Sequence, residues 1–261
     1  MNEHHPVLFV GAGPGDPDLI TVKGQEALRS ADLIIYAGSL VPEAVLKWSD
    51  PAARRINSAG MHLKEIVTEI EAAWLDGRRV VRLHTGDPSL YGAVFEQMAE
   101  LNRQSIPYRV IPGVTAAFAA AAAMGIEYTL PEVSQTVILT RMAGRTPVPE
   151  AENLERLAAH GATMVIYLSM ALVKEVGEVL SRTYGPEAPC AVIFRASHPD
   201  EKILHTVASR LAEDVNTAGI TRQAVIVVGK VLEVSLETLR ATSKLYDRQF
   251  SHGYREGDGK S

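Results

Sequence analysis

The sequence has little cysteine and no excess of positive charge. Its 261 residues contain one cysteine, Cys190, which excludes an internal disulfide and a zinc site built from cysteines. The apolar residues around Cys190 instead predict a small buried side chain. The formal net charge of −5 argues against nucleic acid as the main partner, because phosphate binding needs a basic surface.

Signals for export, membrane insertion and several common active sites are also missing. Residues 1–6 lack the basic and apolar regions of a signal peptide, and no apolar run approaches about 18 residues. We therefore expect a soluble, cytoplasmic protein with no membrane partner. Because the histidines lack the spacing of metal ligands and neither a nucleophile elbow nor a P-loop occurs, we expect no metal.

The sequence does contain short apolar runs that alternate with helical patterns, which predicts an α/β fold with a mainly parallel sheet. We place an N-terminal α/β domain at residues 1–131, a second at 132–242 and a polar tail, which we expect to fray, at 243–261. The expected strands are residues 7–10, 33–36, 79–84, 108–111, 136–141, 163–168, 191–195, 202–207 and 224–228. The expected helices are residues 22–30, 63–75, 91–103, 114–124, 150–160, 172–181 and 210–216.

A glycine-rich turn, Gly-Ala-Gly-Pro-Gly-Asp-Pro at residues 11–17, follows the first expected strand. The dinucleotide fingerprint does not fit, because its third glycine falls on Asp16 and the prolines Pro14 and Pro17 lack N–H donors for a pyrophosphate. The fingerprint also requires an acidic residue at the end of the second strand, whereas here Asp32 precedes that strand. Since open parallel sheets bind ligands at the carboxyl ends of their strands, the turn still predicts a binding site, with a rigid connection as the alternative.

Two further loops, residues 84–88 and 112–116, also follow expected strands. Gly86 permits close approach of a ligand, Asp87 offers an acceptor, and Thr115 can cap the alanine-rich helix. Each loop alone also fits a plain turn or helix cap. Three such loops at one sheet edge favour a common ligand site.

These loops resemble those of the tetrapyrrole methylases of cobalamin biosynthesis, and the resemblance runs from residue 7 to about residue 255. Residues 135–149 and 243–253 are similar to the members that methylate carbon 11 of a precorrin. The resemblance implies two α/β domains with mainly parallel or mixed sheets, a cofactor cleft between them, and a homodimer. It also implies S-adenosylmethionine as methyl donor, with S-adenosylhomocysteine as its product.

The resemblance supplies candidate site residues but no catalytic residue. The expected cofactor contacts are Pro14, Thr85, Gly86, Asp87, Leu90, Thr115, Ala116, Leu168 and Ala196. A precorrin carries several carboxylates, which cationic side chains bind well. The expected substrate contacts are therefore His62, His84, Arg141, Arg145, Arg195 and Lys202.

The resemblance implies a reaction that converts precorrin-4 to precorrin-5. Residues 36–39, Tyr-Ala-Gly-Ser, favour the metal-free substrate. The alternatives are methylation of cobalt-precorrin-4, another precorrin methylase activity on the same fold, and a non-catalytic protein that binds a tetrapyrrole or a nucleoside.

Overall fold

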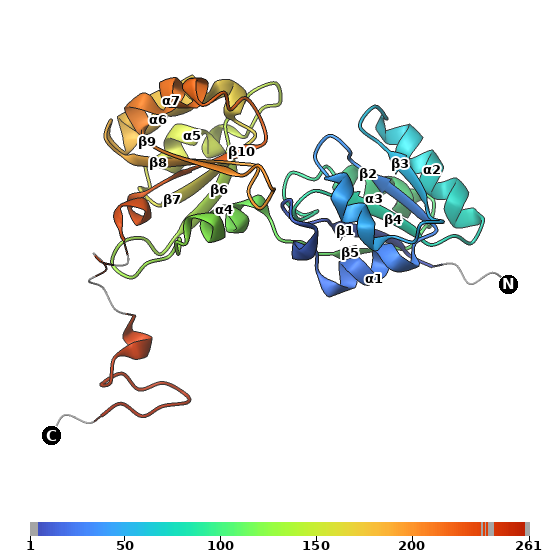
Figure 1. Ribbon diagram of the computed structural model, residues 1–261, viewed down its shortest axis with the longest axis horizontal. Helices are drawn as coiled ribbons and strands as arrows, with labels where there is room; N and C mark the ends of the chain where they lie inside the picture. Colours follow the sequence, from blue (N-terminus) through green and yellow to red (C-terminus); the bar gives the residue numbers. More distant parts are fainter. Residues whose placement is uncertain (1–4, 236, 238, 240–242, 259–261) are drawn as a thin grey trace. The chain divides into compact units, whose positions relative to one another are not determined.

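The computed structural model describes residues 5–258 except 236, 238 and 240–242. Its contacts divide the chain into two compact units, each built around its own β-sheet (Figure 1). The first unit contains residues up to Ala120 together with Arg195–Glu201, and the second contains Ala121–Phe194 and the residues from Lys202 onward. The expected α/β class is confirmed, and the boundary between residues 131 and 132 stays a prediction.

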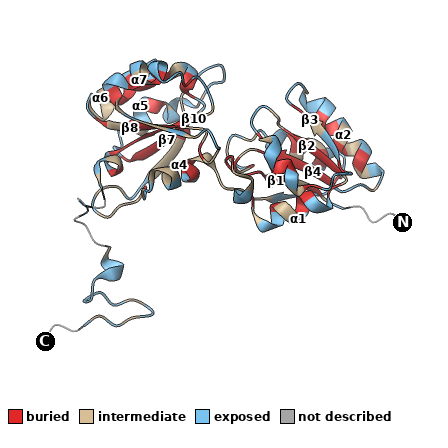
Figure 2. Cartoon of the chain, viewed as in Figure 1, coloured by how far each residue is buried: buried red, intermediate tan, exposed pale blue. Residues whose placement is uncertain are grey.

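The first unit has a fully parallel sheet with the strand order β3-β2-β4-β1-β5. Its strands are β1 (Val7–Gly11), β2 (Leu33–Tyr36), β3 (Arg54–Asn57), β4 (Val80–His84) and β5 (Tyr108–Ile111). The strands β1, β2 and β4 are almost entirely buried (Figure 2), as expected where helices cover both faces of a parallel sheet.

Helices cover both faces of the first sheet. On one face, Leu28 of α1 (Val22–Ser30) packs in a cluster with Val10 of β1. On the other face, α2 (Leu63–Leu75) and α3 (Phe95–Arg103) pack against Phe9 of β1. Val10 and Phe9 point to opposite faces because side chains alternate along a strand. This layering leaves the carboxyl edge of the sheet to the loops.

The second unit has a mixed sheet with the order β6-β7-β10-β8-β9, in which only the β6–β7 pair is parallel. The strands are β6 (Val137–Arg141), β7 (Thr163–Tyr167), β8 (Pro189–Phe194), β9 (Lys202–Val207) and β10 (Ala224–Val228). Residues of α5 (Leu154–Ala158), α6 (Val173–Thr183) and α7 (Leu211–Thr217) form one apolar cluster with this sheet. The remaining helix, α4 (Ala116–Met124), follows β5. No helix in the described part of the chain is long and apolar enough to cross a membrane.

The structure differs from the sequence prediction at a strand and two helices. Strand β3 was missed because its residues Arg-Arg-Ile-Asn at the sheet edge show no apolar run. Helix α3 starts at Phe95 instead of residue 91 because Tyr91 and Ala93 have positive φ angles of 55° and 45°. The helix expected at residues 150–160 is interrupted at Asn153, whose side chain caps α5.

The described part of the C-terminal tail contains local hydrogen bonds, and its fraying stays a prediction. The guanidinium of Arg255 donates hydrogen bonds to the backbone oxygens of Leu245, at 2.8 Å, and Asp247, at 2.6 Å. His252 and Arg255 also pair through their backbones. One side chain therefore satisfies carbonyl groups of this segment that water would otherwise solvate.

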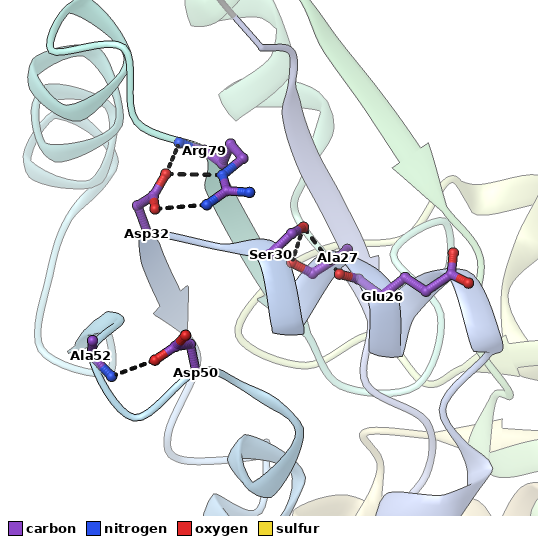
Figure 3. Close-up of polar contacts among 7 residues, drawn as sticks. All are labelled: Glu26, Ala27, Ser30, Asp32, Asp50, Ala52 and Arg79. Carbon is purple, nitrogen blue, oxygen red and sulfur yellow. Dashed lines mark hydrogen bonds and ion pairs between the residues drawn. The ribbon is translucent and has the colours of Figure 1, made fainter.

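A salt bridge at the amino edge of the first sheet joins β2 to β4 (Figure 3). Asp32, just before β2, accepts hydrogen bonds from the Arg79 guanidinium at 3.0 and 3.1 Å and from the Arg79 backbone N–H at 2.8 Å. The guanidinium first, and then the backbone bond, hold the pKa of Asp32 below its usual value. Asp32 is thus a structural link at the edge opposite the glycine-rich loops, consistent with the rejection of a dinucleotide site.

Candidate active site

Three loops meet at the carboxyl edge of the first sheet, after the neighbouring strands β4, β1 and β5. The Gly86 N–H donates to the Gly13 oxygen at 2.8 Å, and the Gly13 N–H donates back to the Gly86 oxygen at 3.3 Å. The Ala12 N–H donates to the His84 oxygen at 2.7 Å. Beyond the parallel pair of β1 with β4, an antiparallel bridge between Gly13 and Gly86 therefore joins the glycine-rich turn to the loop after β4.

The three loops approach too closely for side chains at two positions. A Cβ atom on Gly113 would lie 2.1 Å from the Gly86 oxygen, and one on Gly11 would lie 2.6 Å from the Gly113 Cα. Gly86 has a φ of 59°, a conformation that glycine adopts without strain. The glycines at this edge are thus required by the packing of the loops themselves.

Asp87 joins the loops after β4 and β5. One carboxylate oxygen accepts the Gly113 N–H at 2.8 Å, while the other accepts the Ser89 N–H at 2.8 Å and the Ser89 hydroxyl. Partial burial alone would raise the pKa of Asp87, but the hydrogen bonds from Ser89 and Gly113 together hold it below its usual value. Asp87 is therefore ionised at neutral pH and keeps these two loops together.

A fourth loop, Arg195–Glu201, belongs to the first unit although it joins β8 to β9. The Asp16 N–H donates to the Ser197 hydroxyl at 2.9 Å. A Cβ on Gly15 would lie 2.2 Å from the His198 ring, so the ring packs directly on the glycine-rich turn. Sequence reasoning missed this contact, because Asp16 and Ser197 are 181 residues apart and no periodic pattern connects them.

All the expected cofactor residues except Leu168 lie in the first unit, on these four loops. Pro14, Gly86 and Ala196 are buried, while the others on these loops are half-buried. Leu168 follows β7 in the second unit, with 66% of its surface exposed and a φ of 52°. Their roles stay predictions.

His84 offers no positive charge to a substrate. It is 4% exposed and its ring stacks on Phe9 with a centroid distance of 6.0 Å. Burial first, and then the charge of Arg82, lower its pKa to about 3. Its imidazole is therefore neutral at physiological pH, and its Nε2 atom is buried with no hydrogen-bond partner among the described residues.

Arg82, which sequence reasoning missed, is a buried cation beside His84. Its guanidinium donates to the Gln97 side chain at 2.9 Å and to the Ile35 oxygen at 3.2 Å. Burial lowers its pKa to about 10, so it stays charged at neutral pH. The signal in the sequence was an arginine within the apolar run of residues 80–83.

Arg141 organises the loop that follows β6 in the second unit. Its guanidinium donates to the backbone oxygens of Thr146, at 3.1 Å, and Pro147, at 2.7 Å. Arg145 lies on this loop and is exposed. Two of the five N–H donors of Arg141 thus bind the loop, and Arg145 presents its cation from the loop that Arg141 holds.

The remaining candidates for substrate binding differ in their contacts and exposure. His62 is exposed and caps α2, with its ring accepting the Glu65 N–H at 3.4 Å. Arg195 forms an ion pair with Asp200 at 2.8 Å. Lys202 is exposed at the start of β9. The structure places His62 and Arg195 in the first unit, and Arg141, Arg145 and Lys202 in the second.

The fold and these loops define an α/β protein whose parallel sheet has a backbone-rich carboxyl edge, the place where proteins of this class bind ligands. No group of three acidic, histidine or cysteine side chains within the described ranges is arranged as a metal site.

The chain belongs to the tetrapyrrole (corrin/porphyrin) methylase family, whose model matches residues 6–212. It is 49% identical to the cobalt-precorrin-4 C(11)-methyltransferase of Methanocaldococcus jannaschii over 261 residues, 100% of both chains. It is 48% identical to the precorrin-4 C(11)-methyltransferase of Pseudomonas aeruginosa over 97% of this chain and 99% of the relative. The expected family is confirmed.

Solved structures agree with this assignment. The X-ray structure of a cobalamin biosynthetic enzyme, cobalt precorrin-4 methyltransferase CbiF, matches with a TM-score of 0.86 and 45% identity, over 89% of this chain and 98% of that one. A uroporphyrin-III C-methyltransferase from Thermus thermophilus, complexed with S-adenosylhomocysteine, matches with a TM-score of 0.75 and 27% identity, over 88% of this chain and 100% of that one.

Proposed function

We propose that the enzyme transfers the methyl group of S-adenosylmethionine to carbon 11 of precorrin-4, giving precorrin-5 and S-adenosylhomocysteine. The observation that carries this proposal is the 48–49% identity, over nearly the full length, to relatives named for that position of the ring. The similarity of residues 135–149 to the carbon-11 enzymes supports the same position.

The loops of the first unit fit S-adenosylmethionine, which when bound supplies an activated sulfonium methyl group. Gly86, whose φ of 59° suits glycine, leaves the space beside Thr115 free of a side chain. Pro14 and Ala116 offer small apolar surfaces, and ionised Asp87 retains lone pairs that can accept hydrogen bonds from the cofactor. The solved relative with S-adenosylhomocysteine supports this choice of ligand.

The carboxylates of the substrate require cationic partners. Arg145 and Lys202 are exposed candidates for this role, whereas Arg195 is already paired with Asp200. The ring carbon is itself the nucleophile, so alignment of carbon, methyl and sulfur supplies much of the rate, and no strong base is needed to activate it. His84 is proposed as a neutral contact only, because its charge is suppressed by burial.

Cobalt-precorrin-4 is a second candidate substrate, because the 49% identical relative is named for it. Residues 36–39 favour the metal-free ring. The decisive experiment incubates the enzyme with methyl-labelled S-adenosylmethionine and either precorrin-4 or its cobalt complex. We expect a labelled product methylated at carbon 11 by NMR, formed faster from the metal-free ring.

Faster turnover of the cobalt complex would reverse the choice of substrate. Methylation at another carbon would assign a different precorrin methylase, and binding of both ligands without any product would favour a binding protein.

We also propose that the protein works in the cytoplasm as a homodimer. The single free cysteine, Cys190, suits a reducing compartment. Light scattering after size-exclusion chromatography should give twice the chain mass of 28.2 kDa, and a monomer would contradict the dimer.

A further inference from the structure

We propose that His198 is a positioning residue for the methyl donor: its neutral ring holds the loop Arg195–Glu201 against the glycine-rich turn, and protonation of the ring loosens that turn and weakens cofactor binding. The inference rests on the proposed function, since it assumes that the turn contacts S-adenosylmethionine.

The geometry places His198 between the turn and an arginine. Its ring packs on Gly15, where a Cβ would lie 2.2 to 2.8 Å from three ring atoms. Its Nδ1 atom lies 3.1 Å from the Nη2 of Arg195. The ring thus fills a space that exists only because residue 15 is a glycine.

The contact with Arg195 requires a neutral histidine. A guanidinium can only donate, so Nδ1 must accept and the proton of the ring must be on Nε2. Protonation would place an N–H on Nδ1, opposite another N–H, and would set two cations 3.1 Å apart. The hydrogen bond would then become a repulsion.

Two residues of the loop have a strained backbone conformation. Arg195 and Ser197 have positive φ angles of 49° and 66°, which residues other than glycine rarely adopt. The Ser197 N–H donates to Glu201 at 2.6 Å, and its hydroxyl accepts the Asp16 N–H. Repulsion at His198 therefore acts on a loop that needs its contacts to keep its shape.

The surroundings of His198 favour a neutral ring overall. Burial first, and then Arg195, lower the pKa of His198 from its usual 6.5, while Asp200 and the backbone of Pro14 oppose this shift. Asp16 faces the loop through its backbone N–H and Glu201 through Ser197. Because its pKa is lowered, the ring is neutral at physiological pH and takes up a proton only in more acidic solution.

The test measures the dissociation constant of S-adenosylhomocysteine between about pH 5 and about pH 8, where histidine changes charge. For the wild type we expect affinity to fall as the pH drops through the pKa of His198, by at most about tenfold for each pH unit. His198→Gln keeps an acceptor for Arg195 and cannot be charged, so its affinity should stay nearly constant with pH. His198→Phe keeps the packing but loses the acceptor, and should bind weakly at every pH.

The matched control is His160→Gln, an exposed histidine after α5, which should retain the wild-type pH profile. NMR titration of His198 in the wild type needs no variant, and its midpoint should coincide with the onset of affinity loss. A wild-type pH profile in His198→Gln, wild-type affinity in His198→Phe, or a mismatched NMR midpoint would overturn the proposal. Failure of the wild type to bind S-adenosylhomocysteine at any pH would instead refute the proposed function.

Discussion

At the scale of single residues, the glycines of the site fix how closely three backbones can pack. Gly113 is the tightest case, with 2.1 Å between a built Cβ and the Gly86 oxygen. Gly60, by contrast, is exposed with nothing within 4 Å of its built Cβ. The two positions therefore offer a matched pair of substitutions.

We expect Gly113→Ala to reduce the free energy of unfolding by about 1–3 kcal/mol, because the added methyl group forces two loops apart. It should also weaken binding of S-adenosylhomocysteine. Gly60→Ala should change stability by less than about 0.5 kcal/mol. Urea denaturation of both variants checks this, and equal stabilities would show that the loops can move apart at little cost.

The Asp32–Arg79 link predicts a pH-dependent contribution to stability. Because the pKa of Asp32 is lowered in the folded state, the contribution is fully present above the unfolded value of about 4 and is lost as the pH falls through the folded value. Both side chains are more than a third exposed, so we expect a loss of at most about 1 kcal/mol for Asp32→Asn at pH 7. Denaturation curves should converge with the wild type once the pH lies below the folded-state pKa of Asp32, and a gap that persists there would contradict the ionic origin.

At the scale of elements, the loop after β6 carries the exposed Arg145, and the guanidinium of Arg141 holds this loop in its conformation. Arg145→Ala should raise the KM for the tetrapyrrole by about 10- to 100-fold, the worth of one charge-assisted hydrogen bond. Arg141→Ala should raise it as well, because the loop loses its bonds to Thr146 and Pro147. Affinity for S-adenosylhomocysteine should be nearly unchanged in both.

The control for these variants is Arg222→Ala, an exposed arginine before β10. It should leave both constants unchanged. If the two loop variants lost cofactor and substrate affinity equally, or lost neither, the assignment of these arginines to the substrate would be refuted.

The elements also show what a sequence can predict. Apolar runs predicted β1, β2 and β4 because these strands are buried on both faces, whereas the polar edge strand β3 left no such pattern. The loop positions followed from glycine and proline, whose backbone preferences are local. The contact of Ser197 with Asp16 and the burial of His84 depend on tertiary packing, which no local pattern records.

At the scale of the whole molecule, the proposed cofactor should stabilise the native state. S-adenosylhomocysteine at 100 times its dissociation constant adds about 2.7 kcal/mol, which corresponds to a rise in Tm of about 5–10 °C. NAD is the control ligand, and it should give no shift because Pro14 and Pro17 cannot donate to a pyrophosphate. A rise in Tm with NAD but not with S-adenosylhomocysteine would indicate that the glycine-rich turn binds a dinucleotide.

Because Arg195–Glu201 belongs to the first unit, that unit is completed late in synthesis. The turn at residues 11–17 leaves the ribosome early, but its partner loop is translated about eighty residues after the rest of the first unit. At the usual 5–20 residues per second this delay is roughly 4–16 s. During synthesis the nascent sheet therefore exists with an incomplete ligand edge, and a fragment cut at Ala120 would stay permanently at that stage.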